Sequence, residues 1–209
     1  MTKQKKTKIC DNTYEMQYWS ENCLITGIDE AGRGPLAGPL SVAGVVFPVG
    51  YHNEEIYDSK SLNEKQRNRL YDIIIHDALW YEIMEVDEAT IDRYNILEAD
   101  RNAMRKIALD SPGNVILTDA MKLGIDRPVI DLVKGDQKSI SIAAASILAK
   151  VTRDRIMEMY DGMYPQYDLG KNKGYPTKAH MEAIDVYGIT PIHRRSFGPV
   201  KAKQISFDF

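Results

Sequence analysis

Two adjacent carboxylates, Asp29 and Glu30, follow an apolar run that begins at Leu24, and a glycine-rich turn with one arginine comes directly after them, at residues 31–39. Adjacent side chains on a strand point to opposite faces, so both acids can approach one site only where the strand ends or twists. Glycine permits such a turn and lets main-chain N–H groups come close to a ligand. Carboxylates that can hold a hard cation, beside a turn that can hold an oxyanion, indicate metal-assisted chemistry on a phosphate ester.

Two further acids stand where a site could use them. Asp119 closes the apolar run 115–117, and Asp136 precedes a long segment rich in alanine and isoleucine. Taken alone, Asp119 is typical of a turn and Asp136 of the start of a helix. Gathered at one edge of a sheet, the four carboxylates would repel one another, and divalent cations would relieve that repulsion. Oxygen ligands favour Mg²⁺ or Mn²⁺ over zinc, and two such ions could activate a water and stabilise a leaving oxygen.

The glycine-rich turn also fits a second pattern. Gly32, Gly34 and Ala37 match the dinucleotide fingerprint G-x-G-x-x-A, and two glutamates follow near the distance expected of a ribose-binding acid. That fingerprint must open a helix, whereas here two prolines interrupt the turn and the β-rich segment 40–47 follows. We therefore expect a strand, a loop and an antiparallel strand, and keep a dinucleotide-dependent oxidoreductase as the alternative.

The elements that must position these acids follow from hydrophobic periodicity and capping signals. Ser61 and Glu64 form a capping-box pattern at the start of one helix, and Thr177 and Gly188 bracket the last one. The order predicts a mixed sheet covered by helices. The expected strands are residues 24–28, 40–47, 80–86, 114–119 and 128–133. The helix that Ser61 and Glu64 begin is expected at residues 62–78, and two more helices are expected at residues 89–109 and 139–159.

Composition sets the class of protein. The 209 residues, 44% hydrophobic and 27% charged, fit one globular domain with a real core. A net charge of −3 gives no global attraction to nucleic acid, but lysines around Tyr175 and a basic group at residues 193–203 form either a polyanion-binding groove or a solvated face. The two cysteines, Cys10 and Cys23, lack ligand spacing and indicate a reducing compartment. Because the sequence has neither a bilayer-length apolar run nor a secretory signal, we expect a cytoplasmic protein without a membrane partner.

In their order along the chain, seven segments resemble the type 2 ribonucleases H, specifically bacterial ribonuclease HII. The similarity runs from about residue 24 to residue 200, and the segments are residues 27–39, 58–62, 117–120, 134–136, 141–150, 172–177 and 193–198. The resemblance implies an α/β ribonuclease H-like fold, with a mixed five-stranded sheet flanked by helices and a helical C-terminal region. The activity it implies is hydrolysis of the RNA strand of RNA–DNA hybrids and cleavage 5′ to ribonucleotides embedded in duplex DNA. That cleavage would leave 5′-phosphate and 3′-hydroxyl ends and serve ribonucleotide removal in DNA replication and repair.

Carried over by position, the resemblance implies a role for each candidate residue. The four acids match the catalytic ligands of two Mn²⁺ or Mg²⁺ ions: Asp29, Glu30, Asp119 and Asp136. Gly32, Arg33 and Gly34 match a loop whose backbone reads the 2′-hydroxyl, the group that distinguishes RNA from DNA, and Tyr175 matches a tyrosine beneath that sugar. Lys60 and Ser139 are candidates for phosphate contacts. Thr118 and Ala120, on either side of Asp119, depart from the family pattern without removing a ligand.

We divide the chain into a flexible basic extension at residues 1–23, a catalytic domain at 24–200 and a tail at 201–209. Only 28 residues precede Asp29, fewer than the extra N-terminal domain of the HIII type requires, which favours HII. We expect a monomer that binds RNA–DNA hybrids and ribonucleotide-containing duplex DNA. The tail, Gln204 to Phe209, loosely resembles a sliding-clamp-binding peptide, with an ordinary frayed end as the alternative. A non-catalytic hybrid-binding module would lack a carboxylate, and none of the four is missing.

Overall fold

The computed structural model describes residues 10 and 12–204, and five strands in this part of the chain form one mixed sheet. The strands are β1 (Ile25–Ala31), β2 (Leu40–Val46), β3 (Trp80–Val86), β4 (Val115–Asp119) and β5 (Val129–Leu132). Their order across the sheet is β3-β2-β1-β4-β5. Strands β3, β2 and β1 run antiparallel to one another, whereas β4 lies parallel to both β1 and β5. The predicted mixed five-stranded sheet is confirmed, as is the antiparallel strand after the glycine-rich loop.

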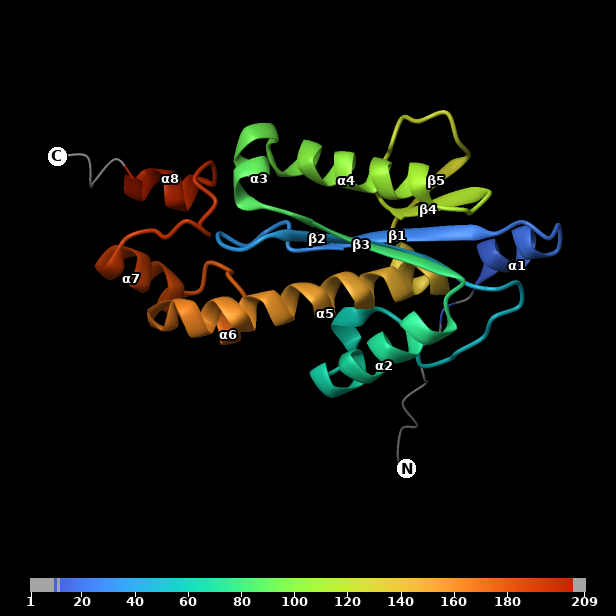
Figure 1. The fold of residues 1–209 in the computed structure, drawn as a ribbon, viewed down its shortest axis with the longest axis horizontal. Coiled ribbons are helices and arrows are strands. Elements are labelled where there is room, and N and C mark those ends of the chain that lie inside the picture. The colour runs from blue at the N-terminus through green and yellow to red at the C-terminus, as the bar shows by residue number, and fades with distance from the viewer. Residues whose placement is uncertain (1–9, 11, 205–209) are drawn as a thin grey trace, which may run out of the picture.

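Helices cover both faces of this sheet (Figure 1). The long helix α5 (Ile140–Met163) and α2 (Glu64–Asp77) lie on one face, and α3 (Glu88–Tyr94) and α4 (Ile96–Asp110) lie on the other. Gly27 lets α5 approach β1 closely, because a Cβ at this position would lie 2.2 Å from the carbonyl carbon of Ser141. The alanine-rich start of α5 therefore packs directly onto the strand that carries the first two acids.

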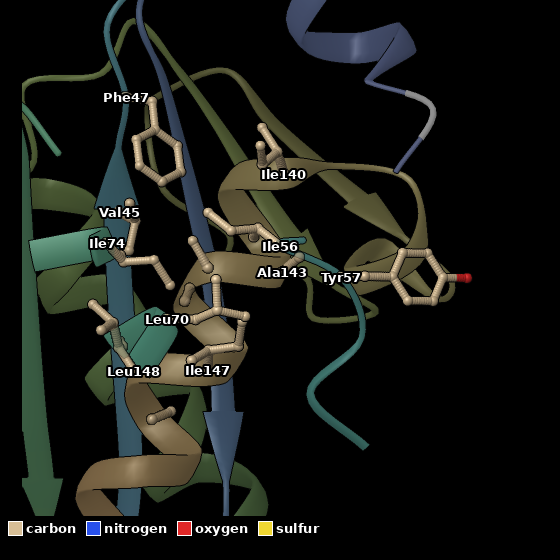
Figure 2. Packing of buried hydrophobic residues seen from close by; sticks show 14 of the residues in the cluster. Val45, Phe47, Ile56, Tyr57, Leu70, Ile74, Ile140, Ala143, Ile147 and Leu148 are labelled. Atoms are coloured by element: carbon tan, nitrogen blue, oxygen red, sulfur yellow. The ribbon is translucent and has the colours of Figure 1, made fainter. Parts of the chain in front are cut away.

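The core between α5, α2 and the sheet is built from branched and aromatic side chains. Figure 2 shows Val45 and Phe47, at the end of β2, beside Leu70 and Ile74 of α2 and Ile147 of α5. A second cluster packs α4 against the opposite face of the same strands. Close packing on both faces fixes the position of β1 and β4, and with it the positions of the acids at their ends.

Two helix boundaries differ from the prediction. The capping box of α2 is made by Asn63 and Gln66, whereas Ser61 lies in the short 3₁₀ helix η1 (Ser59–Ser61) and donates to the Asp58 carbonyl. The single helix predicted at 89–109 is broken at Asn95, which has a φ of 63° and caps α4 through its side chain. Asparagine is enriched among non-glycine residues at positive φ, and here its side chain accepts hydrogen bonds from the main chain of Leu97 and Glu98, which stabilise the start of α4.

The predicted terminal segments contain secondary structure. Residues assigned to a flexible N-terminal extension include helix α1 (Thr13–Trp19), whose Glu15 is fully buried. Residues 201–204, assigned to a tail, belong to α8 (Gly198–Gln204). The rest of the C-terminal region contains α6 (Leu169–Asn172) and α7 (Lys178–Tyr187), as the expected helical region requires. The clamp-like residues 205–209 lie outside the described part of the chain.

Short 3₁₀ helices η2 (Gly135–Gln137) and η3 (Pro165–Tyr167) complete the described structure, one at each end of α5. Within residues 10 and 12–204, no helix combines the length and the apolar character needed to cross a bilayer.

Candidate active site

Asp29 and Glu30 lie near the end of β1, beyond the last residue of β1 that pairs with the parallel strand β4. Pairing between β1 and β4 stops at Ile28 and Thr118, whereas β1 continues beside β2 through Ala31. Asp29 points to the α5 face and Glu30 to the α4 face, as strand alternation requires. Because β4 no longer covers β1 there, both carboxylates reach one cavity, together with Asp119 at the end of β4. This is the strand-end arrangement that the sequence predicted.

The cavity measures about 410 Å³ and gathers most of the predicted site. Eight of the ten candidate residues line it: Asp29, Glu30, Gly32, Arg33, Gly34, Lys60, Asp119 and Tyr175. Asp136 and Ser139 are not among the lining residues. Main chain from β1, the following loop and the segment around Tyr175 therefore converge on the carboxylates.

The carboxylates hinder one another's ionisation. Burial raises the pKa of Asp29 well above its usual range, and the negative charges of Glu30 and Asp119 raise it further. Burial also raises the pKa of Glu30, although Arg33 works against that shift, and one oxygen of Glu30 lies buried without a hydrogen-bond partner among the described residues. Carboxylate oxygens with unused acceptor capacity and unneutralised charge suit a hard divalent cation. In the part of the chain that the structure describes, no three acidic, histidine or cysteine side chains form a preassembled metal cluster.

Asp136 lies in η2, beside the cavity. Asp119 accepts a hydrogen bond of 2.9 Å from the Gly135 main chain, which ties the turn that carries Asp136 to the end of β4. Burial, followed by the charges of Asp58 and Asp119, raises the pKa of Asp136 to about 6. The fourth acid is thus electrostatically coupled to the others.

The loop after β1 is shaped by close contact with a buried arginine of α5. Gly32 has a φ of 105°, and a Cβ there would lie 2.2 Å from Nε of Arg153. Arg153 donates to the carbonyls of Pro39 (2.9 Å), Ala37 (3.1 Å) and Lys173 (2.9 Å). One guanidinium therefore joins the glycine-rich loop to the segment that leads to Tyr175.

A second buried arginine holds the same loop from the C-terminal region. Arg194 donates to the carbonyls of Gly38, Pro35 and Arg33 at 2.9, 2.9 and 3.2 Å. Burial, with the positive charge of nearby Arg153, lowers the pKa of Arg194 to about 9. His193 is also buried, so neither residue belongs to the basic surface considered at residues 193–203. These two members of that group serve the interior of the fold.

Tyr175 lines the same cavity as the acids. Its side chain is 44% exposed, and its ring lies next to Gly34, where a Cβ would be 3.4 Å from the Tyr175 Cε1 atom. The preceding residue, Gly174, accepts a hydrogen bond of 2.8 Å from the Leu36 main chain. An exposed aromatic face is thus held beside the glycine loop.

With this geometry in place, comparison with known proteins identifies the family. The family model of ribonuclease HII matches residues 26–200, which is most of the chain. The chain belongs to the ribonuclease HII family. It is therefore a ribonuclease H, an endonuclease that binds RNA–DNA hybrids and hydrolyses their RNA strand.

Individual relatives support this assignment. Ribonuclease HII of Lactobacillus helveticus is 49% identical over 90% of the chain and 76% of its own length. The crystal structure of ribonuclease H2 from Pyrococcus horikoshii superimposes with a TM-score of 0.75 at 27% identity, covering 88% of the chain and 98% of that protein. A PCNA:RNase HII complex from Archaeoglobus fulgidus gives a TM-score of 0.69 at 26% identity, covering 82% and 93%. Bst-RNase HIII, crystallised in complex with Mn²⁺, shares the fold with a TM-score of 0.65 at 18% identity, covering 89% and 70%.

The two weaker candidates of this ribonuclease HII chain have different outcomes. Lys60 lines the cavity; burial works to lower its pKa, but the charges of Asp136 and Asp29 outweigh burial and raise it overall. Ser139 is fully buried, donates to Glu15 and accepts from the main chain of Ile142. Its hydroxyl is used to start α5, and Ser139 does not line the cavity, so the structure does not bring this candidate to the site.

Sequence reasoning missed several residues of the site. Ser146 and Ser59 share a hydrogen bond of 2.8 Å, and the Ser146 hydroxyl favours the ionised form of Asp29. Lys150 lines the cavity one turn further along α5. Ser59, Ser146 and Lys150 lie inside segments that carried the family resemblance, which was the one signal that pointed to them. Asp100 of α4 lay in no such segment, although it lies within 3.5 Å of Arg33.

Proposed function

We propose that this ribonuclease HII cuts duplex DNA on the 5′ side of an embedded ribonucleotide as well as longer hybrids, and leaves 5′-phosphate and 3′-hydroxyl ends. The observation that carries the proposal is one cavity lined by three carboxylates, by the Gly32–Gly34 loop and by Tyr175. Because the acids lie beside a loop and an aromatic ring that can contact a ribose, cleavage can be directed to the phosphodiester next to a single ribonucleotide.

In this proposal Asp29, Glu30, Asp119 and Asp136 hold two divalent cations, Mn²⁺ or Mg²⁺. The mutual charge of the carboxylates and the unpartnered Glu30 oxygen support the fit. Bound ions would supply activation of the attacking water and stabilisation of the leaving 3′-oxygen. The protein's own part is to hold four oxygen donors at the ends of β1 and β4 and in η2, on elements fixed by the core.

Recognition of the ribonucleotide falls to the loop and to Tyr175. The loop conformation is fixed by hydrogen bonds from Arg153 and Arg194, so its main-chain groups are held in place before substrate binds. A 2′-hydroxyl can both donate and accept, which makes it a suitable partner for such a backbone. The exposed Tyr175 ring provides an apolar surface for the sugar above it.

Positive charge along the cavity supports binding of the phosphate backbone. Lys60 and Lys150 both line the cavity, although Lys150 is also paired with Asp154 at 2.6 Å. Lysines near phosphates add affinity without sequence preference. We therefore place substrate affinity in these lysines and cleavage in the acids.

We further propose a monomer that removes ribonucleotides during DNA replication and repair and contacts a sliding clamp through residues 204–209. The Archaeoglobus fulgidus relative was solved as a complex with PCNA, which supports a clamp as partner. Helix α8 ends at Gln204, so the proposed clamp-binding residues continue directly from this helix.

The test is a gel assay on a labelled DNA duplex with one embedded ribonucleotide, run with Mg²⁺, with Mn²⁺ and with chelator. We expect metal-dependent cleavage on the 5′ side of the ribonucleotide, and none for Asp119→Asn. Cleavage confined to longer hybrids would refute the roles of the loop and Tyr175. Absence of cleavage with either metal would leave a binding module as the better description.

A further inference from the structure

A buried carboxylate lies behind the glycine loop, on a helix that the catalytic scheme does not use. Asp100 is in α4, and its side chain is 0% exposed. Neither of its oxygens has a hydrogen-bond partner among the described residues. An acid buried in this way destabilises the fold unless another group compensates its charge.

The positive group next to Asp100 is the arginine of the loop. Burial, followed by the negative charge of Glu30, raises the pKa of Asp100 to about 8, and Arg33 works against that rise without cancelling it. Nε of Arg33 lies 3.5 Å from a carboxylate oxygen of Asp100, and Nη1 lies 3.8 Å from an oxygen of Glu30. The guanidinium thus spans two acids, one at the site and one behind it. Of the three side chains, only that of Arg33 is substantially exposed, at 43%.

The two contacts have different consequences for the loop. Glu30 belongs to the proposed cation site, so its charge is shared with any bound ion and its hold on Arg33 weakens when substrate and metal arrive. Asp100 is fully buried in α4, and its helix neighbours Ala99 and Ala103 are buried as well, so the packed helix fixes its position. Arg33 keeps a fixed anchor whatever the state of Glu30.

We propose that Asp100 is a positioning residue that holds the Arg33 guanidinium, and thereby the Gly32–Gly34 loop, in the conformation that distinguishes a ribonucleotide strand from DNA. This proposal rests on the proposed function of the loop. It separates Asp100 from the cation-holding acids, because Asp100 acts through Arg33 and touches neither substrate nor metal.

The test compares the affinity for an RNA–DNA hybrid with that for an all-DNA duplex of the same sequence. Fluorescence anisotropy in EDTA measures both without cleavage. Asp100→Asn keeps the shape and removes the ionisable carboxyl group that lies 3.5 Å from Arg33, and we expect it to lower the ratio of the two affinities about tenfold. Asp110→Asn is the matched control, because Asp110 is an exposed residue of the same helix paired with Lys106. Its ratio should equal that of the wild type.

A double-mutant cycle with Arg33→Ala shows whether the effect passes through the arginine. In that background Asp100→Asn should leave the affinity ratio unchanged. Thermal unfolding gives an independent readout: Asp100→Asn should melt no lower than wild type, because it replaces a buried carboxyl group, whose pKa burial raises to about 8, by a neutral amide. A ratio is insensitive to the fraction of folded protein, so a merely structural role would lower the melting temperature and leave the ratio alone.

Two results would overturn the inference while leaving the proposed function intact: a wild-type preference for the hybrid that survives in Asp100→Asn, or an Asp100→Asn effect that persists in full without Arg33. A wild-type protein that shows no preference for the hybrid and does not cut an embedded ribonucleotide would overturn the proposed function, and the inference with it.

Discussion

Replacing Arg153 by lysine tests how the reading loop is held. The guanidinium donates to the carbonyls of Pro39, Ala37 and Lys173 from a fully buried position. A lysine keeps the charge but can reach only one of these carbonyls, so two buried acceptors lose a charged donor. At about 1.5–3 kcal/mol for each bond to a charged group, the two lost bonds predict a loss of about 3–6 kcal/mol in the free energy of unfolding.

For a chain of 209 residues this corresponds to a fall in melting temperature of about 10 °C. Chemical denaturation and thermal melting measure the change. The matched control is Arg155→Lys, two residues further along α5, where the exposed guanidinium lies over the Tyr71 ring at 4.4 Å and bonds to Asn68. We expect that control to lose less than about 1 kcal/mol.

Activity provides the second measurement. Because Arg153 connects the loop to the Tyr175 segment, Arg153→Lys should lower cleavage of an embedded ribonucleotide at temperatures where the variant is fully folded. If Arg153→Lys is as stable as Arg155→Lys and cuts as well as the wild type, the assigned role of these three hydrogen bonds is refuted.

Three further predictions follow from the same geometry. Asp119→Asn should abolish cleavage while hybrid affinity in EDTA stays within about threefold of wild type, because lysines and main chain supply the binding; a near-normal cleavage rate in the gel assay would refute the assignment. Gly32→Ala should lower the free energy of unfolding in urea by at least about 2 kcal/mol, because a φ of 105° disfavours a side chain and the new Cβ would meet Arg153. The control is Gly162→Ala in α5, where a Cβ would have no neighbour within 4 Å. Burial, with the nearby His180, lowers the pKa of His193 to about 4, so as the pH falls the unfolded chain binds this proton before the folded chain does. The contribution of His193 to the free energy of unfolding is therefore complete above about pH 6.5 and falls by about 3 kcal/mol as the pH drops to 4. Denaturation at several pH values should show that this contribution is absent from His193→Gln.

Local patterns were sufficient to predict the sheet and the placement of its acids. Strand periodicity located β1 and β4, and the rule that sites form at strand ends brought Asp29 and Asp119 together. The break at Asn95 was missed because the apolar period continues across it and only the cap geometry shows the turn. Helix α1 was missed because the basic segment 1–8 before it indicated a solvated tail, and seven residues are too few to show a helical period, while its Glu15 is buried against the start of α5.

The contacts that shape the loop could not be found by pattern reasoning. Arg194 and the carbonyl of Arg33 are 161 residues apart, and Arg153 lies 114 residues from Pro39. A hydrogen bond from a side chain to a distant main chain leaves no spacing in the sequence. An arginine in a basic segment therefore suggests a solvated or phosphate-binding surface, and only the folded chain shows that Arg194 points inward.

The same long separation has a consequence for synthesis. The loop leaves the ribosome early, whereas the arginine that fixes it from the C-terminal region is translated 161 residues later. At about 10 residues per second, some 16 s pass between the two events. At the start of that interval the nascent chain contains Asp29 and Glu30, and Asp119 and Asp136 are added during it. Throughout the interval the hydrogen bonds from Arg194 to the glycine-rich loop are missing. The loop can therefore reach its folded shape only after Arg194 has been translated, late in the synthesis of the chain.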